Sequence, residues 1–105
     1  MSSLSTHVLD TALGRPAEGV NVRLYQGAQQ IADGTTDHDG RIAELAPTLE
    51  HGTYRLSFDV VAYAESTGQD TFFPEVSVTF TVADERHYHV PLLLSPFAFS
   101  TYRGS

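Results

Sequence analysis

The chain has 105 residues, contains neither cysteine nor lysine, and carries a formal net charge of −7 at pH 7. Absent cysteine excludes a disulfide scaffold, a thiolate zinc site and a cysteine nucleophile, and absent lysine excludes Schiff-base chemistry. The acidic balance argues against nucleic-acid binding and against electrostatic docking to an anionic membrane, because both need a basic surface.

Apolar and polar residues alternate along much of the chain, as expected for strands with one face on a core. Between residues 62 and 69 the alternation stops, and residues 61–65 are expected to form one or two helical turns that end at Gly68. Seven or eight short strands with one short helix predict an all-β sandwich. In chain order, strands are expected at 4–10, 20–25, about 31–35, 41–45, 54–60, 76–82, 86–94 and 97–103.

The last two expected strands differ from the others because they carry apolar or aromatic residues on both faces. A strand on the outside of a sandwich does so when a second subunit covers it. We therefore expect a symmetric homo-oligomer. Residues 1–105 are expected to form one domain, and the lack of a targeting segment or of an apolar run near ~20 residues predicts a cytoplasmic protein.

Three histidines are candidates for chemistry. His7 lies in a strand pattern on the same face as Ser5, and an imidazole there is either a proton acceptor or simply a hydrogen-bonded strand residue. His87 and His89 are two residues apart and so project to one side of a strand. Such a pair suits zinc, but the sequence offers no third ligand, and one functional histidine beside a bystander is the preferred interpretation.

Arginine and the end of the chain supply the other candidates. Arg41 follows the turn sequence 37–40, and its guanidinium suits an anion or a developing oxyanion, although a surface ion pair with a nearby aspartate is the simpler interpretation. The chain ends in Tyr102-Arg103-Gly104-Ser105, where glycine would let the last residue turn back toward a site. His38 and His51 lie in acidic turns and are expected to be solvated.

Four segments together resemble the transthyretin-related family, in its 5-hydroxyisourate hydrolase branch. The resemblance covers the whole chain, and its most specific element is the terminal tetrapeptide. It implies a transthyretin-like (prealbumin-like) sandwich of two four-stranded sheets with one short helix. It also implies a homotetramer, a dimer of dimers with active sites where the dimers meet. The segments that carry it are 5–10, 37–41, 88–96 and 102–105.

The resemblance further implies an activity, the hydrolysis of 5-hydroxyisourate to 2-oxo-4-hydroxy-4-carboxy-5-ureidoimidazoline in urate degradation, with no cofactor and no metal. Our hypothesis is that two imidazoles hold and deprotonate water while the guanidinium binds the substrate, although which histidine is the base stays open. The implied catalytic positions are His7, Arg41, His89 and Ser105. The implied substrate-binding positions are His7, Arg41, Tyr102, Arg103 and Gly104.

Three other functions remain in competition with hydrolysis. The first is a non-catalytic carrier of a small ligand on the same fold, which the two imidazoles and the guanidinium disfavour. The second is an immunoglobulin-like adhesion or sugar-binding module, which would be a monomer or part of a longer multidomain chain. The third is a histidine metal site, which dialysis against a chelator would reveal.

Overall fold

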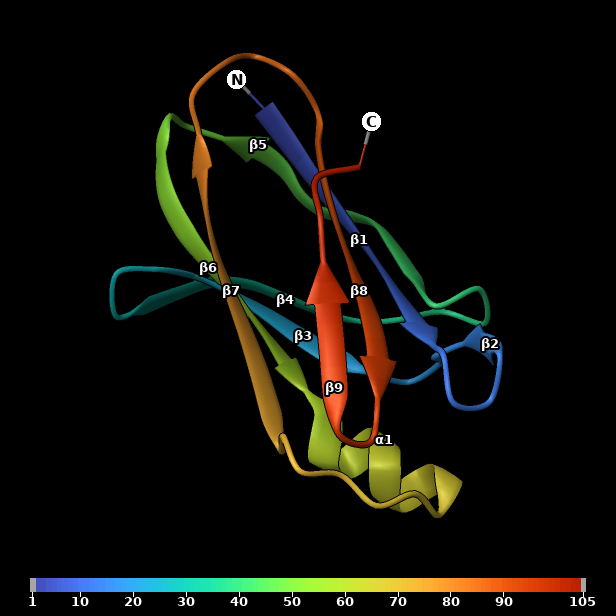
Figure 1. The fold of residues 1–105 in the computed structure, drawn as a ribbon. Helices are drawn as coiled ribbons and strands as arrows, with labels where there is room; N and C mark the ends of the chain where they lie inside the picture. The colour runs from blue at the N-terminus through green and yellow to red at the C-terminus, as the bar shows by residue number, and fades with distance from the viewer. Residues whose placement is uncertain (1, 105) are drawn as a thin grey trace.

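The computed structural model describes residues 2–104, in which two β-sheets pack face to face and one helix lies at an end of the sandwich (Figure 1). In chain order the elements are β1 (Ser2–Asp10), β2 (Arg15–Pro16), β3 (Asn21–Gln26), β4 (Gln29–Thr35), β5 (Arg41–Leu49), β6 (Gly52–Asp59), α1 (Val60–Thr67), β7 (Glu75–Val82), β8 (Tyr88–Ser95) and β9 (Ala98–Thr101).

The first sheet has β1 at its centre. Its strands run in the order β2-β1-β8-β9, and β5 also pairs with β1. The β1–β8 pair is parallel, whereas β5 and β2 run antiparallel to β1. The second sheet has the order β4-β3-β6-β7.

The predicted all-β sandwich with one short helix is confirmed, with one difference in strand number. In the described part of the chain the first sheet has a fifth strand, β2, in which Arg15 and Pro16 pair with Asp10 and Leu9. Two residues are too few to show alternation, and they lie between turn-forming glycines.

The core lies between the sheets and follows the two-residue period of the strands. Leu4 and Val8 of β1 and Leu92 of β8 are fully buried and meet Leu56 and Phe58 of β6 within one apolar cluster. The residues that alternate with this inner face, such as Ser5 and His7 on β1 and His89 on β8, therefore face outward, away from the second sheet.

Helix α1 begins after Asp59, whose carboxylate accepts a hydrogen bond from the amide of Ala62, and ends at Gly68 in a left-handed conformation. The predicted end at Gly68 is confirmed. Within residues 2–104 no helix has the length and hydropathy needed to cross a bilayer.

A buried carboxylate ties the helix to the first sheet. The Tyr63 hydroxyl donates to Asp10 Oδ2 over 2.6 Å, and the Gln69 amide donates to the same oxygen over 2.9 Å. Burial raises the pKa of the Asp10 carboxyl, but these hydrogen bonds outweigh burial and hold that pKa below its ordinary value. Burial and the contact with Asp10 raise the pKa of Tyr63 to about 12.

Candidate active site

Strand β1 brings three predicted site residues together through its pairing with two neighbours. In the antiparallel ladder His7 lies opposite Arg41 of β5, and in the parallel ladder Ser5 lies opposite His89 of β8. Ser5 and His7 are two residues apart, so their side chains share the outward face. The predicted convergence of two imidazoles and one guanidinium therefore arises within a single protomer.

The His7 imidazole is held by the turn that precedes Arg41. Its Nε2 lies 2.9 Å from the backbone carbonyl oxygen of Asp39. A carbonyl oxygen only accepts, so Nε2 carries the hydrogen and the neutral ring has its lone pair on Nδ1. The ring centroids of His7 and His89 are 6.5 Å apart, which leaves room for a small group between the two imidazoles.

The same turn sets the position of Arg41. The Asp37 carboxylate accepts hydrogen bonds from the amides of Asp39 and Arg41, over 2.9 and 3.0 Å. Gly40 has φ of 74°, and its carbonyl accepts from the Val8 amide over 2.7 Å, so a side chain there would be strained and would meet the β1 backbone. Because Asp37 serves the backbone, the exposed Arg41 guanidinium forms no ion pair with any described residue.

His89 differs from His7 in its electrostatic surroundings. Burial is the main cause that lowers the pKa of His89 below the ordinary 6.5, and the nearby Arg41, His7 and His87 lower it further. The His89 ring is therefore neutral at pH 7. Its Nδ1 lies 2.7 Å from Ser5 Oγ, and its Nε2 has no hydrogen-bond partner within residues 2–104.

Gly104 joins the tail of the chain to this site. Its amide donates to the carbonyl of His89 over 2.8 Å. A Cβ built on Gly104 would lie 2.5 Å from Cδ2 of the His89 ring, closer than real contacts allow. Glycine is thus needed here for close approach to the imidazole, and not for a left-handed turn, because its φ is not positive. The predicted site residue Ser105 lies outside the described residues.

Tyr102 and Arg103 lie in the tail beside β7 and β8. The Arg103 guanidinium lies over the Tyr88 ring, 4.3 Å from its centroid, and 4.0 Å from the Asp84 carboxylate. Arg103 and Tyr102 line a hollow of about 210 Å³ between β7 and the tail, together with Phe80. Within one protomer these two side chains are therefore separate from the imidazole pair, and Arg103 anchors the tail to β8.

Two further residues in the site were not predicted to have a role. Ser5 Oγ lies 2.7 Å from His87 Nε2 as well as from His89, and Ser3 Oγ lies 2.5 Å from His87 Nδ1. Ser3, Ser5 and His7 alternate on one face of β1, which is a visible signal. The sequence did not reveal that β8 lies parallel beside them.

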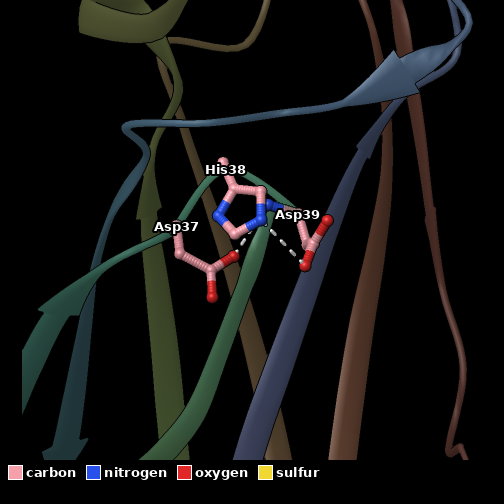
Figure 2. A group of neighbouring side chains, drawn as sticks. All are labelled: Asp37, His38 and Asp39. Carbon is pink, nitrogen blue, oxygen red and sulfur yellow. Dashed lines mark hydrogen bonds and ion pairs between the residues drawn. The ribbon is translucent and has the colours of Figure 1, made fainter.

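The expectation for His38 and His51 is confirmed, because both rings are exposed and lie 3.4 and 2.9 Å from the carboxylates of Asp39 and Glu85. Figure 2 shows His38 between Asp37 and Asp39, a group whose potential ligand atoms lie within 4.8 Å of one another. Because the Asp37 carboxylate accepts two backbone amides, turn geometry explains this group, and we assign it no metal.

The outward face has the groups needed to add water to a carbonyl carbon. Ser5, Arg41, His87 and His89 line an open hollow of about 280 Å³. A neutral imidazole with an open nitrogen is a proton acceptor, and a free guanidinium stabilises negative charge. The fold and the site define a β-sandwich protein with an acid–base centre on the outer face of one sheet.

Comparison with known proteins gives the particular family. The chain belongs to the HIUase/Transthyretin family, whose model matches residues 4–104. It is 50% identical over 109 residues to the 5-hydroxyisourate hydrolase of Salmonella dublin, an alignment that covers 97% of this chain and 80% of that protein. The family resemblance predicted from the sequence is confirmed.

Solved structures agree with this assignment. The fold matches the 5-hydroxyisourate hydrolase of Klebsiella pneumoniae with a TM-score of 0.94 and 39% identity, over 100% of both chains. It also matches sea bream transthyretin in complex with thyroxine, with a TM-score of 0.92 and 35% identity over 97% of this chain and 94% of that one. The predicted transthyretin-like fold is confirmed.

Proposed function

We propose that this protein hydrolyses 5-hydroxyisourate to 2-oxo-4-hydroxy-4-carboxy-5-ureidoimidazoline, a step of urate degradation. The observation that carries the proposal is the meeting of His7, Arg41 and His89 on one outward face, with the His89 ring held neutral. The relatives named 5-hydroxyisourate hydrolase support the choice of substrate.

His89 is the general base in this mechanism. A water molecule loses a proton to His89 Nε2 while its oxygen bonds to the carbonyl carbon of the cyclic amide. When the carbon–nitrogen bond of the ring breaks, the same proton passes to the leaving nitrogen and His89 becomes neutral again. His7 orients the water through Nδ1, the nitrogen left open by its bond to Asp39. Positioned acid–base catalysis of this kind contributes about 10²–10⁴-fold.

Arg41 is the electrophilic partner. A tetrahedral intermediate places negative charge on the former carbonyl oxygen, and a free guanidinium beside the imidazoles stabilises that charge. The turn at residues 37–40 holds the Arg41 backbone in place, so its side chain is available to substrate. Arg41 also binds the substrate before the reaction.

The tail forms one wall of the site. Gly104 lies against His89, and Arg103 holds the tail on β8 through Tyr88. In this proposal Tyr102, Arg103 and Gly104 bind the substrate, and Ser105 is a catalytic residue. Arg103 also anchors the tail. Removal of the last four residues abolishes activity while the sandwich still folds. A fully active truncated protein would contradict a role for the tail.

The assembly in this proposal is a homotetramer made as a dimer of dimers. The edge strands β7 and β9 each have one partner strand in the described chain. Residues of both strands line the same hollow. Exposed Phe97, Phe99 and Tyr102 lie on or next to β9. Such open edges favour pairing with a second copy. Two dimers then meet across the outward face of the first sheet, which places the sites at their interface.

Residues 1–105 act as a single hydrolase domain that needs no cofactor and works in the cytoplasm. Matching of the family model to residues 4–104 supports the domain. Dialysis against a chelator leaves activity unchanged, and fractionation of the source cells tests the location. A chelator-sensitive enzyme would contradict the cofactor-free mechanism.

The decisive experiment follows the ultraviolet absorbance of 5-hydroxyisourate made freshly from urate. The purified protein accelerates the decay of this compound above the blank, and the His7→Ala and His89→Ala variants lose most of that acceleration. Decay at the rate of the blank would contradict the proposal. Tight binding of an aromatic ligand without turnover would instead support a carrier.

A further inference from the structure

Four side chains on the outward face form one continuous line of hydrogen bonds. Ser3 Oγ contacts His87 Nδ1 over 2.5 Å, His87 Nε2 contacts Ser5 Oγ over 2.7 Å, and Ser5 Oγ contacts His89 Nδ1 over 2.7 Å. Along this line His87 is exposed, Ser5 is 8% exposed and His89 is half-buried. The mechanism proposed above uses only its last member.

The hydrogens on this line have to agree with one another. Ser5 Oγ has one hydrogen and lies between two imidazole nitrogens, so it donates to one ring and accepts from the other. A base that works through Nε2 needs its hydrogen on Nδ1, which then donates to Ser5. Ser5 must in turn donate to His87 Nε2, and His87 Nδ1–H donates to Ser3. This polarity satisfies every atom of the line, and so does its reverse, but only this one leaves the lone pair on His89 Nε2.

The reverse polarity would leave His89 without the lone pair that a base needs. In that arrangement Ser3 donates to His87 Nδ1, His87 Nε2–H donates to Ser5, and the Ser5 hydrogen points at His89 Nδ1. His89 Nδ1 is then the acceptor, and a neutral His89 carries its hydrogen on Nε2. That nitrogen has no lone pair with which to take a proton from water.

We infer that Ser5 and His87 are positioning residues that set the tautomer of His89. The inference rests on the proposed function for its catalytic meaning, but the tautomer itself is a property of the unliganded protein. No proton needs to travel along the line, because the proton taken from water returns from His89 Nε2 to the leaving nitrogen.

The charged groups near the line surround His89 or have partners outside the line. His89 faces His7 of β1, Arg41 of β5 and His87, and their charges lower its pKa. Acidic groups near His87 in the chain have other partners. Asp84 accepts from the Tyr88 hydroxyl and contacts Arg103, and Glu85 contacts His51.

The kinetic test compares Ser5→Ala with Ser5→Thr, which keeps the hydroxyl. Ser5→Ala lowers kcat by about 10- to 100-fold while KM changes little, because a small misplacement of a catalytic group is costly. Ser5→Thr recovers most of the wild-type kcat. Ser77→Ala, an exposed serine on β7, is the matched control and stays at the wild-type rate. Equal kcat values for Ser5→Ala and wild type would overturn the inference.

The far end of the line is tested at His87. His87→Ala removes the acceptor of the Ser5 hydrogen and lowers kcat in the same direction as Ser5→Ala. His51→Ala, also an exposed histidine, keeps the wild-type kcat. An unchanged kcat in His87→Ala would contradict the role of His87.

A spectroscopic test separates this inference from the proposed function. Nitrogen-15 spectra of the imidazoles in the unliganded protein show His89 protonated on Nδ1 at pH 8. In Ser5→Ala the Nδ1–H population of His89 falls in favour of Nε2–H. A protein that shows this dependence on Ser5 but no hydrolysis would support the inference and contradict the proposed substrate. Nε2-protonated His89 at pH 8 would overturn the inference even in an active enzyme.

Discussion

The two faces of strand β1 have opposite chemistry, although their residues alternate one by one along the chain. On the inner face Leu4, Thr6 and Val8 are fully buried, and the one hydroxyl among them is bonded to the Val90 carbonyl over 2.7 Å. On the outer face Ser5 contacts the His89 ring, and His7 Nε2 contacts the Asp39 carbonyl. The Nδ1 atom of His7 has no hydrogen-bond partner within residues 2–104. Neighbouring residues of β1 thus differ in role: the inner face contributes to stability, and the outer face contributes to the proposed catalysis.

The largest expected effect comes from His89 on the outer face. His89→Ala lowers kcat/KM for 5-hydroxyisourate by about 10²–10⁴-fold, because the general base is lost. The free energy of unfolding changes by less than about 1 kcal/mol, since the ring lies outside the core. Absorbance kinetics and urea unfolding measure the two effects. A variant that unfolds but reacts normally when folded would reverse the assignment of the two faces.

The inner face is tested three residues further along β8, at Leu92. Leu92→Ala removes a fully buried side chain and costs about 2–5 kcal/mol of unfolding free energy. The activity per folded molecule stays near that of the wild type. Urea unfolding followed by circular dichroism gives the stability, and Leu13→Ala, an exposed leucine, serves as the control. Equal losses in both variants would contradict the placement of the core.

The link between helix and sheet is tested at Tyr63. Tyr63→Phe leaves the buried Asp10 carboxylate without its 2.6 Å donor and costs about 1.5–3 kcal/mol of stability, as expected for a hydrogen bond to a charged group. Turnover stays unchanged because Tyr63 lies on α1 and does not line the hollow at His89. Tyr25→Phe, on β3, is the control. Loss of turnover with retained stability would contradict this division.

Gly104 connects the tail to the outer face. Gly104→Ala forces a Cβ against the His89 ring and lowers kcat/KM by about 10- to 100-fold, because small displacements of a base are costly. Folding is retained. Ser100→Ala on exposed β9 keeps the wild-type activity. Wild-type activity in Gly104→Ala would show that His89 does not need the tail at this distance.

The smallest effect is the pH dependence of stability that comes from His89. Its pKa in the folded protein lies below 6.5, so the unfolded chain binds the proton more readily. The contribution of His89 is present above pH 6.5 and is lost as the pH falls through the folded pKa. Below pH 6.5 the free energy of unfolding of His89→Gln therefore falls less than that of the wild type. A steeper loss in the variant would show that the sign is wrong.

Alternation along the chain was enough to predict the strands and their inward faces, because period two is a local property. The end of the helix at Gly68 was predictable for the same reason, because a glycine cap is a local signal. The two-residue strand β2 was not predictable, since Arg15 and Pro16 acquire their pairing from β1.

The site was predictable only in part. The family resemblance supplied His7, Arg41 and His89. The local sequence alone favoured a surface ion pair for Arg41 and did not say which of His87 and His89 is the bystander. The line through Ser5 depends on the parallel register of β1 and β8, which joins residues more than eighty positions apart. A local pattern contains no information on that register.

The central claim is that the two outward-facing imidazoles act on one water molecule, and a double-mutant cycle tests it most directly. The measurement is kcat/KM for wild type, His7→Ala, His89→Ala and the double variant. Groups that act as a unit are strongly non-additive, so the double variant should be little slower than the slower single variant. Losses that simply multiply would show that the two histidines act independently and would contradict the account.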